Sequence, residues 1–238
     1  MHIPNDFLDP KTSTGLTFAA AGALAYCYSR VREVVTLSVS QEALAAAGSS
    51  VSSFAGKARR TLSASGAALV LRMLAVGSLI FTAQMFDFPV TGGTSGHLLG
   101  CAFAGIALGP WAGAMVMAAV LAVQCVFFGD GGILSLGANI INMAVVGAVG
   151  GYYIYYGIRK LKPGKAGYYF AVAAASWMSV VIAAAMTAFE VGLSGTYEVG
   201  WSLNSMISVH VIVGAAEALM TIAILGFFGR TLKEKEER

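Results

Sequence analysis

Possible nitrogen ligands stand at the very start of this sequence, which reads MHIPND. His2 follows Met1 directly, so the Met1 α-amine, the His2 amide nitrogen and the His2 imidazole can close two adjoining chelate rings on one metal ion. If the amide loses its proton, the three nitrogens lie near one plane and a fourth nitrogen completes a square. Square-planar nitrogen sites suit Ni²⁺ and Cu²⁺. The alternative interpretation is that His2 is a disordered terminal residue.

The obvious fourth donor is His97, in the stretch PVTGGTSGHLLG. Glycines in this stretch let the backbone approach a ligand closely. His97 comes just before an apolar run that could span a membrane, and a histidine at membrane depth is costly unless it has a function. The stretch is also compatible with a flexible exterior turn. Thr94 and Ser95 belong to the same turn and are candidates for orienting a ligand.

The chelate needs a free amine on Met1. Histidine is a large neighbour for methionine aminopeptidase, so we expect Met1 to stay in place. No basic segment precedes the first predicted span, so we also expect no signal peptide. Pro4 stiffens the chain behind the chelate and favours an extended Ile3.

Other polar residues lie within apolar stretches. His210 and Glu217 are seven positions apart and share one helix face, so they are candidates for pairing with each other or for orienting a ligand. Asp130 lies in a GDGG sequence that predicts an exterior turn. Asn139 and Asn142 follow it, and we interpret both as ordinary contacts between helices.

The composition is that of a membrane protein. Hydrophobic residues make up 57% of the 238 residues and charged residues only 11%, with a mean hydropathy of +0.74. A soluble domain carries about 25% charged residues. We therefore predict an all-α polytopic membrane protein with about seven transmembrane helices, since each needs roughly 20 apolar residues. The sequence lacks the ten-residue segments of alternating apolar and polar residues that are typical of a transmembrane β-barrel.

The predicted spans lie at about 13–31, 66–86, 95–109, 111–128, 136–157, 168–189 and 204–229. The third and fourth meet at Gly109–Pro110, which favours a tight hairpin over one long kinked helix. The expected organisation is a metal-chelating segment at 1–12, a helical bundle at 13–229 with a long cytoplasmic loop at 33–65, and a charged cytoplasmic tail at 230–238.

Basic residues set the expected orientation. With the N-terminus outside and the C-terminus in the cytoplasm, nearly all lysines and arginines face inward, and only Lys11 falls outside. Arg72 lies inside the second span, close enough to its end to snorkel. The net charge of +3 is then a signal of topology in the cell membrane and does not indicate nucleic-acid binding.

Five stretches resemble the CbiM/NikM family, the substrate-binding membrane subunits of energy-coupling factor (ECF) transporters for cobalt and nickel. They are MHIPNDFL, QMFDFPVTGGTSGHLLG, GPWAG, FFGDGGILSLGANIINMAVVG and HVIVGAAEAL, in a consistent order across 1–31 and 66–229. The resemblance implies a helical bundle with an extra N-terminal span, into which the N-terminus dips. It also implies a square-planar site for Co²⁺ or Ni²⁺ made by Met1, His2 and His97.

The chain departs from the family pattern in two places. The family usually reads MHIPDGFL, whereas this chain has Asn5 and Asp6 and so lacks the glycine of the turn. The chelating atoms are unaffected by this change. The 33–65 loop is also longer than expected for the family.

The favoured function is a metal-binding transporter subunit, and neither an enzyme nor a resident cofactor is expected. The chain has no P-loop and cannot energise transport by itself. The resemblance implies a coupling transmembrane subunit, two ATPase subunits and often a small accessory membrane subunit as partners. A stand-alone ion-coupled carrier that uses Glu217 and Asp87 is the alternative. An intramembrane metalloenzyme would need a pair such as HExxH, which is absent.

Overall fold

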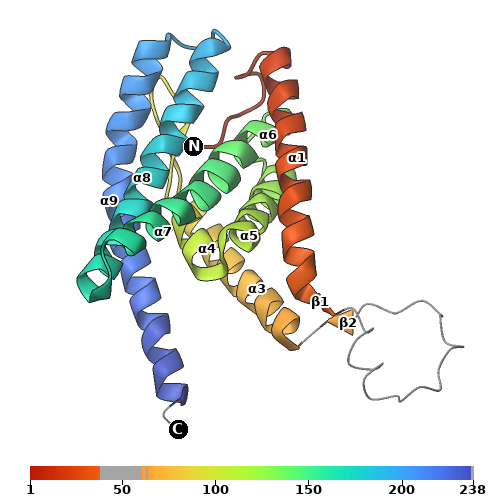
Figure 1. The fold of residues 1–238 in the computed structure, drawn as a ribbon. Coiled ribbons are helices and arrows are strands. Elements are labelled where there is room, and N and C mark those ends of the chain that lie inside the picture. Colours follow the sequence, from red (N-terminus) through yellow and green to blue (C-terminus); the bar gives the residue numbers. More distant parts are fainter. Residues whose placement is uncertain (38–60, 63, 237–238) are drawn as a thin grey trace, which may run out of the picture.

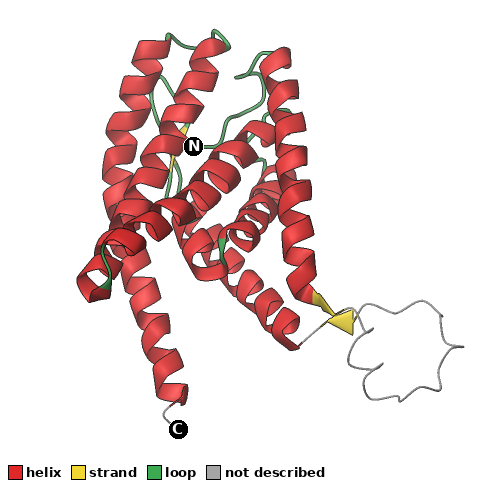
Figure 2. Ribbon diagram, in the orientation of Figure 1, coloured by secondary structure: helices red, strands yellow, loops and turns green. Residues whose placement is uncertain are grey.

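The computed structural model of the protein describes residues 1–37, 61–62 and 64–236. These residues form a bundle of helices with two short antiparallel sheets (Figure 1; Figure 2). Most of the predicted 33–65 loop and the end of the predicted 230–238 tail lie outside the described residues. The helices are α1 (Pro10–Val35), α3 (Ala64–Gln84), α4 (Cys101–Leu108), α5 (Pro110–Val123), α6 (Leu136–Asn139), α7 (Gly151–Leu161), α8 (Gly164–Leu193) and α9 (Val199–Glu236).

Two of the helices continue through π-helical turns. η1 (Gln124–Phe128) extends α5, and η2 (Ile140–Gly150) joins α6 to α7. The four strands contain two residues each: β1 (Thr36–Leu37), β2 (Thr61–Leu62), β3 (Phe88–Pro89) and β4 (Ser95–Gly96). β1 pairs with β2 and β3 with β4. The second pair matters for function, because it lies within the stretch that carries His97.

Five helical segments in the described part are long and apolar enough to cross a membrane. They are Gly66–Gln84, Pro110–Phe128, Leu136–Leu161, Gly164–Leu193 and Val199–Phe227. Each corresponds to one predicted span. Helix α1 covers the predicted span 13–31 but is not among these five; its sequence mixes serine, threonine and glycine with the apolar residues.

The predicted span at 95–109 is wrong as a membrane-crossing helix. Residues before Cys101 form strand β4 and a loop, and α4 contains only eight residues. Eight residues rise about 12 Å, well short of a hydrocarbon core of about 30 Å. Glycine contributes to the difference, because Gly100, within the predicted span and just before α4, has a φ of 70°, which a right-handed helix does not contain. The apolar composition of 95–109 led us to predict one continuous helix there.

The predicted hairpin between α4 and α5 is confirmed, and the single kinked helix is excluded. Gly109 has a φ of 83°, and Pro110 begins α5, where its missing N–H costs nothing. The two helices pack closely because small residues face each other. A side chain added at Gly113 would place its Cβ 2.8 Å from the backbone of Ala104 and Gly105.

Helices α8 and α9 run antiparallel and pack along each other, as the blue pair in Figure 1 shows. Asn142 of η2 donates hydrogen bonds to Glu190 Oε2 (2.7 Å) and Thr187 Oγ1 (3.2 Å) of α8. This contact between helices is the role that we predicted for Asn142.

The N-terminal segment enters the bundle. In Figure 1 the chain turns back from the start of α1, and its first residues contact β4 and α6. Met1 and Ile3 are 0% exposed, and His2 is 3% exposed. A non-helical segment therefore supplies part of the core, and its backbone groups must find partners there.

Candidate metal site

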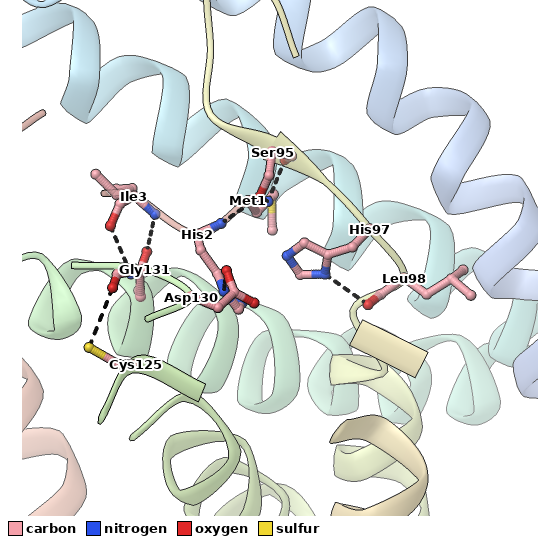
Figure 3. A network of polar contacts seen from close by, with 10 residues as sticks. Met1, His2, Ile3, Ser95, His97, Leu98, Cys125, Asp130 and Gly131 are labelled. Carbon is pink, nitrogen blue, oxygen red and sulfur yellow. Dashed lines mark hydrogen bonds and ion pairs between the residues drawn. The ribbon is translucent and has the colours of Figure 1, made fainter. Parts of the chain in front are cut away.

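The first two residues contact the loop that carries His97. The Met1 amine donates hydrogen bonds to the Ser95 carbonyl oxygen and to Ser95 Oγ, the latter at 2.7 Å (Figure 3). The His2 amide N–H donates to the same Oγ at 3.2 Å. One serine side chain thus accepts protons from two of the proposed ligand nitrogens. Ser95, a candidate for orienting the ligands, lies directly against them.

The backbone of Ile3 is held from the opposite side. Its N–H donates to Asn139 Oδ1 (2.9 Å), and its carbonyl oxygen accepts from Asn139 Nδ2 (3.3 Å) and from the Gly132 N–H (2.8 Å). Gly132 leaves room for this contact, since an added Cβ would lie 2.3 Å from the Asn5 nitrogen. Our interpretation of Asn139 as a contact between helices is wrong, because its amide pairs with the N-terminal segment.

The turn after Pro4 compensates for the missing family glycine. Ser135 Oγ donates to the Pro4 carbonyl oxygen (2.8 Å), and the Leu134 N–H donates to Asn5 Oδ1 (3.1 Å). Asp6 takes a φ of 68°, and it is the only non-glycine residue of the described part with a positive φ. Asp and Asn enter this left-handed region more readily than other side chains. The turn therefore forms even though this chain lacks the glycine of the family pattern.

His97 presents one ring nitrogen to the N-terminal segment. Its Nδ1 lies 2.9 Å from the Leu98 carbonyl oxygen, so Nδ1 must carry the proton. Nε2 then keeps its lone pair, and it is buried without a hydrogen-bond partner in the described structure. The rings of His97 and His2 meet edge to face, with centroids 4.6 Å apart (Figure 3). A buried nitrogen acceptor with no partner, beside a second imidazole, is a natural metal ligand.

Burial favours the neutral form of each of these groups. The three groups lie outside the membrane-spanning helices, and desolvation lowers the pKa of the Met1 amine to about 4. Desolvation also lowers the pKa of His2, and it lowers the pKa of His97 well below its ordinary value, helped by the nearby amine. Neutral amine and imidazole groups are the forms that bind metal ions.

Asp130 also contacts the site. Its Oδ1 lies 2.6 Å from His2 Nδ1. Gly131, next to it, has a φ of 85°, and a Cβ there would lie 3.4 Å from the His2 Cβ. We predicted only an exterior turn for this sequence. An acidic residue between glycines was the only hint in the sequence that Asp130 belongs to the site. Its partner, His2, lies 128 positions earlier in the chain.

Glu217 of α9 holds the other side of the site. Its Oε2 accepts the Leu99 N–H at 2.8 Å, and its Oε1 accepts the Gly100 N–H. Gln84 Nε2 donates to the Leu99 carbonyl oxygen at 2.6 Å. The backbone immediately after His97 is therefore fixed by two buried side chains from α3 and α9, and Glu217 is placed to orient the predicted ligand.

Thr94 and His210 do not touch the proposed ligands through hydrogen bonds. Thr94 Oγ1 is buried without a partner in the described part, and its carbonyl oxygen accepts the Val90 N–H at 3.1 Å. His210 Nδ1 lies 2.7 Å from the Met206 carbonyl oxygen, one helical turn back, rather than pairing with Glu217. Its Nε2 is buried and has no partner among the described residues.

The chain matches a family model over residues 34–234. That model describes CbiM, the cobalt uptake substrate-specific transmembrane region. The chain belongs to the CbiM family. A crystal structure of a truncated transition metal transporter has the same fold, with a TM-score of 0.79, 26% identity and coverage of 97% of this chain and 99% of that one. Cobalt and nickel transport is the function of this family, and the chain is a multi-pass membrane protein.

Two CbiM-family relatives are named for nickel. The chain is 40% identical to the "Putative fused nickel transport protein NikMN" of Archaeoglobus fulgidus over 154 residues, which are 64% of this chain and 50% of that protein. It is 30% identical to the fused nickel transport protein NikMN of Rhodobacter capsulatus over 249 residues, covering 98% of this chain and 63% of that protein. The chain thus spans about half to two thirds of the length of these relatives.

Proposed function

We propose that this CbiM-family protein binds Co²⁺ or Ni²⁺ as its transported substrate through four nitrogens. They are the Met1 amine, the His2 amide and imidazole nitrogens, and His97 Nε2. The carrying observation is that Met1, His2 and His97 converge in one buried place, with His97 Nε2 left as a free acceptor. Two segments separated by more than 90 residues supply these atoms, so a bound ion would link them.

The residues around the nitrogens suit the chemistry of the chelate. A metal ion replaces the amide proton of His2, and Ser95 Oγ already accepts that proton in a hydrogen bond. His2 Nδ1 is the ring atom that closes a six-membered chelate with the amide nitrogen. In the structure Asp130 Oδ1 lies 2.6 Å from this atom and accepts its proton. When Nδ1 binds a metal ion that proton moves to Nε2, and the carboxylate balances part of the charge of the cation.

The transport role that we propose is that of the substrate-binding subunit of an ATP-driven ECF transporter. The family and the absence of a P-loop from the sequence support it. The partners are a coupling transmembrane subunit, two ATPase subunits and a small accessory membrane subunit. The proposed topology places the N-terminus outside and the C-terminus in the cytoplasm. The inward bias of lysine and arginine supports this orientation.

The stand-alone carrier is not favoured. It needs Glu217 as a site for a coupling ion, but both oxygens of Glu217 accept backbone hydrogen bonds. It also needs Asp87 at membrane depth, and Asp87 is an exposed residue between α3 and β3.

The proposed site is tested by comparing two histidine variants of the purified protein by calorimetry. His97→Ala removes the fourth ligand, so metal affinity falls at least about tenfold, which corresponds to about 1.4 kcal/mol. His210→Ala is the comparison variant, because His210 is equally buried and its Nδ1 pairs with the Met206 carbonyl oxygen rather than with a proposed ligand. Unchanged affinity in His97→Ala would exclude the site. Uptake by cells that express the chain with and without the ATPase and coupling subunits tests the ATP-driven role separately.

A further inference from the structure

A cavity lies away from the metal site, where α1 ends and α3 begins. It has a volume of about 390 Å³. In Figure 1 this end of α1 and α3 points away from the first residue of the chain. The residues that line it are Arg30, Val31, Val34, Ala68, Leu69, Arg72, Leu108, Gly109, Pro110, Trp111 and Ala112. Three separate elements therefore form its walls: α1, α3 and the turn between α4 and α5.

The cavity is strongly positive. Arg30 and Arg72 both line it, and no carboxylate is among the lining residues. Neither arginine forms a hydrogen bond or an ion pair with any described residue of the chain. The first turn of α5, which contains no acidic residue, adds its own positive potential. Two guanidinium groups that share one recess without a counter-charge favour an anion between them.

The surroundings of the cavity are those of a membrane interface. Trp111 packs edge to face with Tyr26 (ring centroids 5.1 Å apart) and Tyr153 (6.4 Å). Tryptophan and tyrosine gather at the depth of lipid headgroups. On α3, Leu71 and Leu74 next to Arg72 are 67% and 62% exposed. An apolar helix surface thus leads directly to the two arginines.

We propose that this cavity binds the phosphate of an anionic phospholipid, with its acyl chains along the exposed face of α3. Arg30 and Arg72 hold the phosphate, and Trp111 and the turn at Gly109 form the wall around the headgroup. Phosphate chemistry alone would also suit a free phosphate ion. The lipid is favoured because the recess opens beside exposed leucines, which acyl chains cover and a soluble anion does not. Basic recesses between membrane helices are known to take such headgroups.

The test uses Trp111 as a reporter inside the cavity. The full-length chain contains three tryptophans, and Trp177→Phe with Trp201→Phe leaves Trp111 alone. This protein is reconstituted in bilayers that contain brominated phosphatidylglycerol or brominated phosphatidylcholine, whose bromines quench nearby tryptophan. We expect phosphatidylglycerol to quench Trp111 preferentially. Each arginine should contribute about fivefold to the preference, from roughly 1 kcal/mol per basic residue near anionic lipid.

Substitutions separate charge from structure. Arg30→Gln with Arg72→Gln should abolish the preference, whereas Arg30→Lys with Arg72→Lys should retain most of it. Lys165→Gln, which removes a positive charge from the exposed first turn of α8, should leave it unchanged. Native mass spectrometry of the otherwise wild-type chain, counting phosphatidylglycerol retained with and without the two glutamine substitutions, gives the same answer if the tryptophan variant does not fold.

Three results would overturn the proposal. Equal quenching by the two lipids would indicate that the recess serves another partner, such as an acidic segment of a protein. Displacement of the lipid by millimolar inorganic phosphate would assign the site to a soluble anion. A preference that survives Arg30→Gln with Arg72→Gln would locate the lipid elsewhere.

Discussion

The two segments that carry the proposed ligands are fixed in different ways. Residues 1–5 have no helix or strand of their own, and several neutral hydrogen bonds from the 132–139 region hold their backbone. The backbone after His97 depends on Glu217 alone for two of its N–H groups. Loss of that one side chain would leave two buried N–H groups without an acceptor, whereas each backbone group of residues 1–5 loses only one of several supports. Support is thus distributed on one side of the site and concentrated on the other, so single substitutions should affect the two sides unequally.

The largest effect is expected on the concentrated side. Glu217→Ala leaves the N–H groups of Leu99 and Gly100 buried without an acceptor and releases the loop that carries His97. We expect metal affinity to fall about 10–100-fold, as for other residues that orient a ligand. The matched control is Glu190→Ala, a buried acid that bonds to Asn142 and makes no contact with the site. It should lower the melting temperature while calorimetry shows nearly unchanged affinity. Equal losses of affinity in both variants would contradict the comparison.

A smaller effect is expected on the distributed side. Asn139→Ala removes two hydrogen bonds from Ile3, but the bond from Gly132 and those to Pro4 and Asn5 remain. Metal affinity should fall about tenfold or less, since a neutral hydrogen bond contributes about 0.5–1.5 kcal/mol. Asn142→Ala, three residues along the same helix, should destabilise the bundle without weakening metal binding. The idea fails if the two asparagine variants bind metal equally well.

The proposed ligands and most of the helices could be predicted from the sequence because both depend on residues close together in the chain. The chelate of Met1 and His2 depends on adjacent atoms, and the five apolar helices follow from hydropathy. The roles of Asn139 and Asp130 depend on contacts across more than 120 positions, which spacing does not reveal. The proposal of His97 as fourth ligand stays a prediction, as does the division into segments at 1–12, 13–229 and 230–238.

The π-helical turns were also beyond sequence reasoning. Nothing in the composition of 140–150 distinguishes them from an α-helix, although they follow directly after Asn139. Such turns often lie at functional sites. The 33–65 loop falls mostly outside the described residues, but α1 continues to Val35, so its first residues are helical.

The pH dependence of metal affinity also distinguishes the two segments. Burial lowers the pKa values of the Met1 amine, His2 and His97, so near neutral pH these groups have no proton to release. Only the N-terminal segment, through the His2 amide, then loses a proton on binding. Apparent affinity should therefore rise about tenfold per pH unit from about pH 7 to 8, and fall more steeply as acid reaches the lowered pKa values. Titrations at several pH values measure this, and a flat profile would indicate carboxylate ligands.

The smallest expected effect concerns the turn at Asp6. Asp6→Gly restores the glycine of the family pattern at a φ of 68°, where glycine carries no steric cost. We expect a gain of up to about 1 kcal/mol in the free energy of unfolding, with unchanged metal affinity. Asp6→Val is the opposing control, because a β-branched side chain is strained at positive φ. The melting temperature should be higher than wild type for Asp6→Gly and lower than wild type for Asp6→Val. A loss of stability in Asp6→Gly would mean that the aspartate side chain itself holds the turn.

The enclosed Met1 has a consequence for biosynthesis. The partners of the first three residues lie up to 136 positions further along the chain. At a translation rate of about 5–20 residues per second, the chain end waits roughly 7–27 s before Asn139 has been made. During that interval the α-amine is open to cytosolic enzymes, and in the proposed topology it must still reach the far side of the membrane. The oldest residues of the nascent protein are therefore among the last to take their final position.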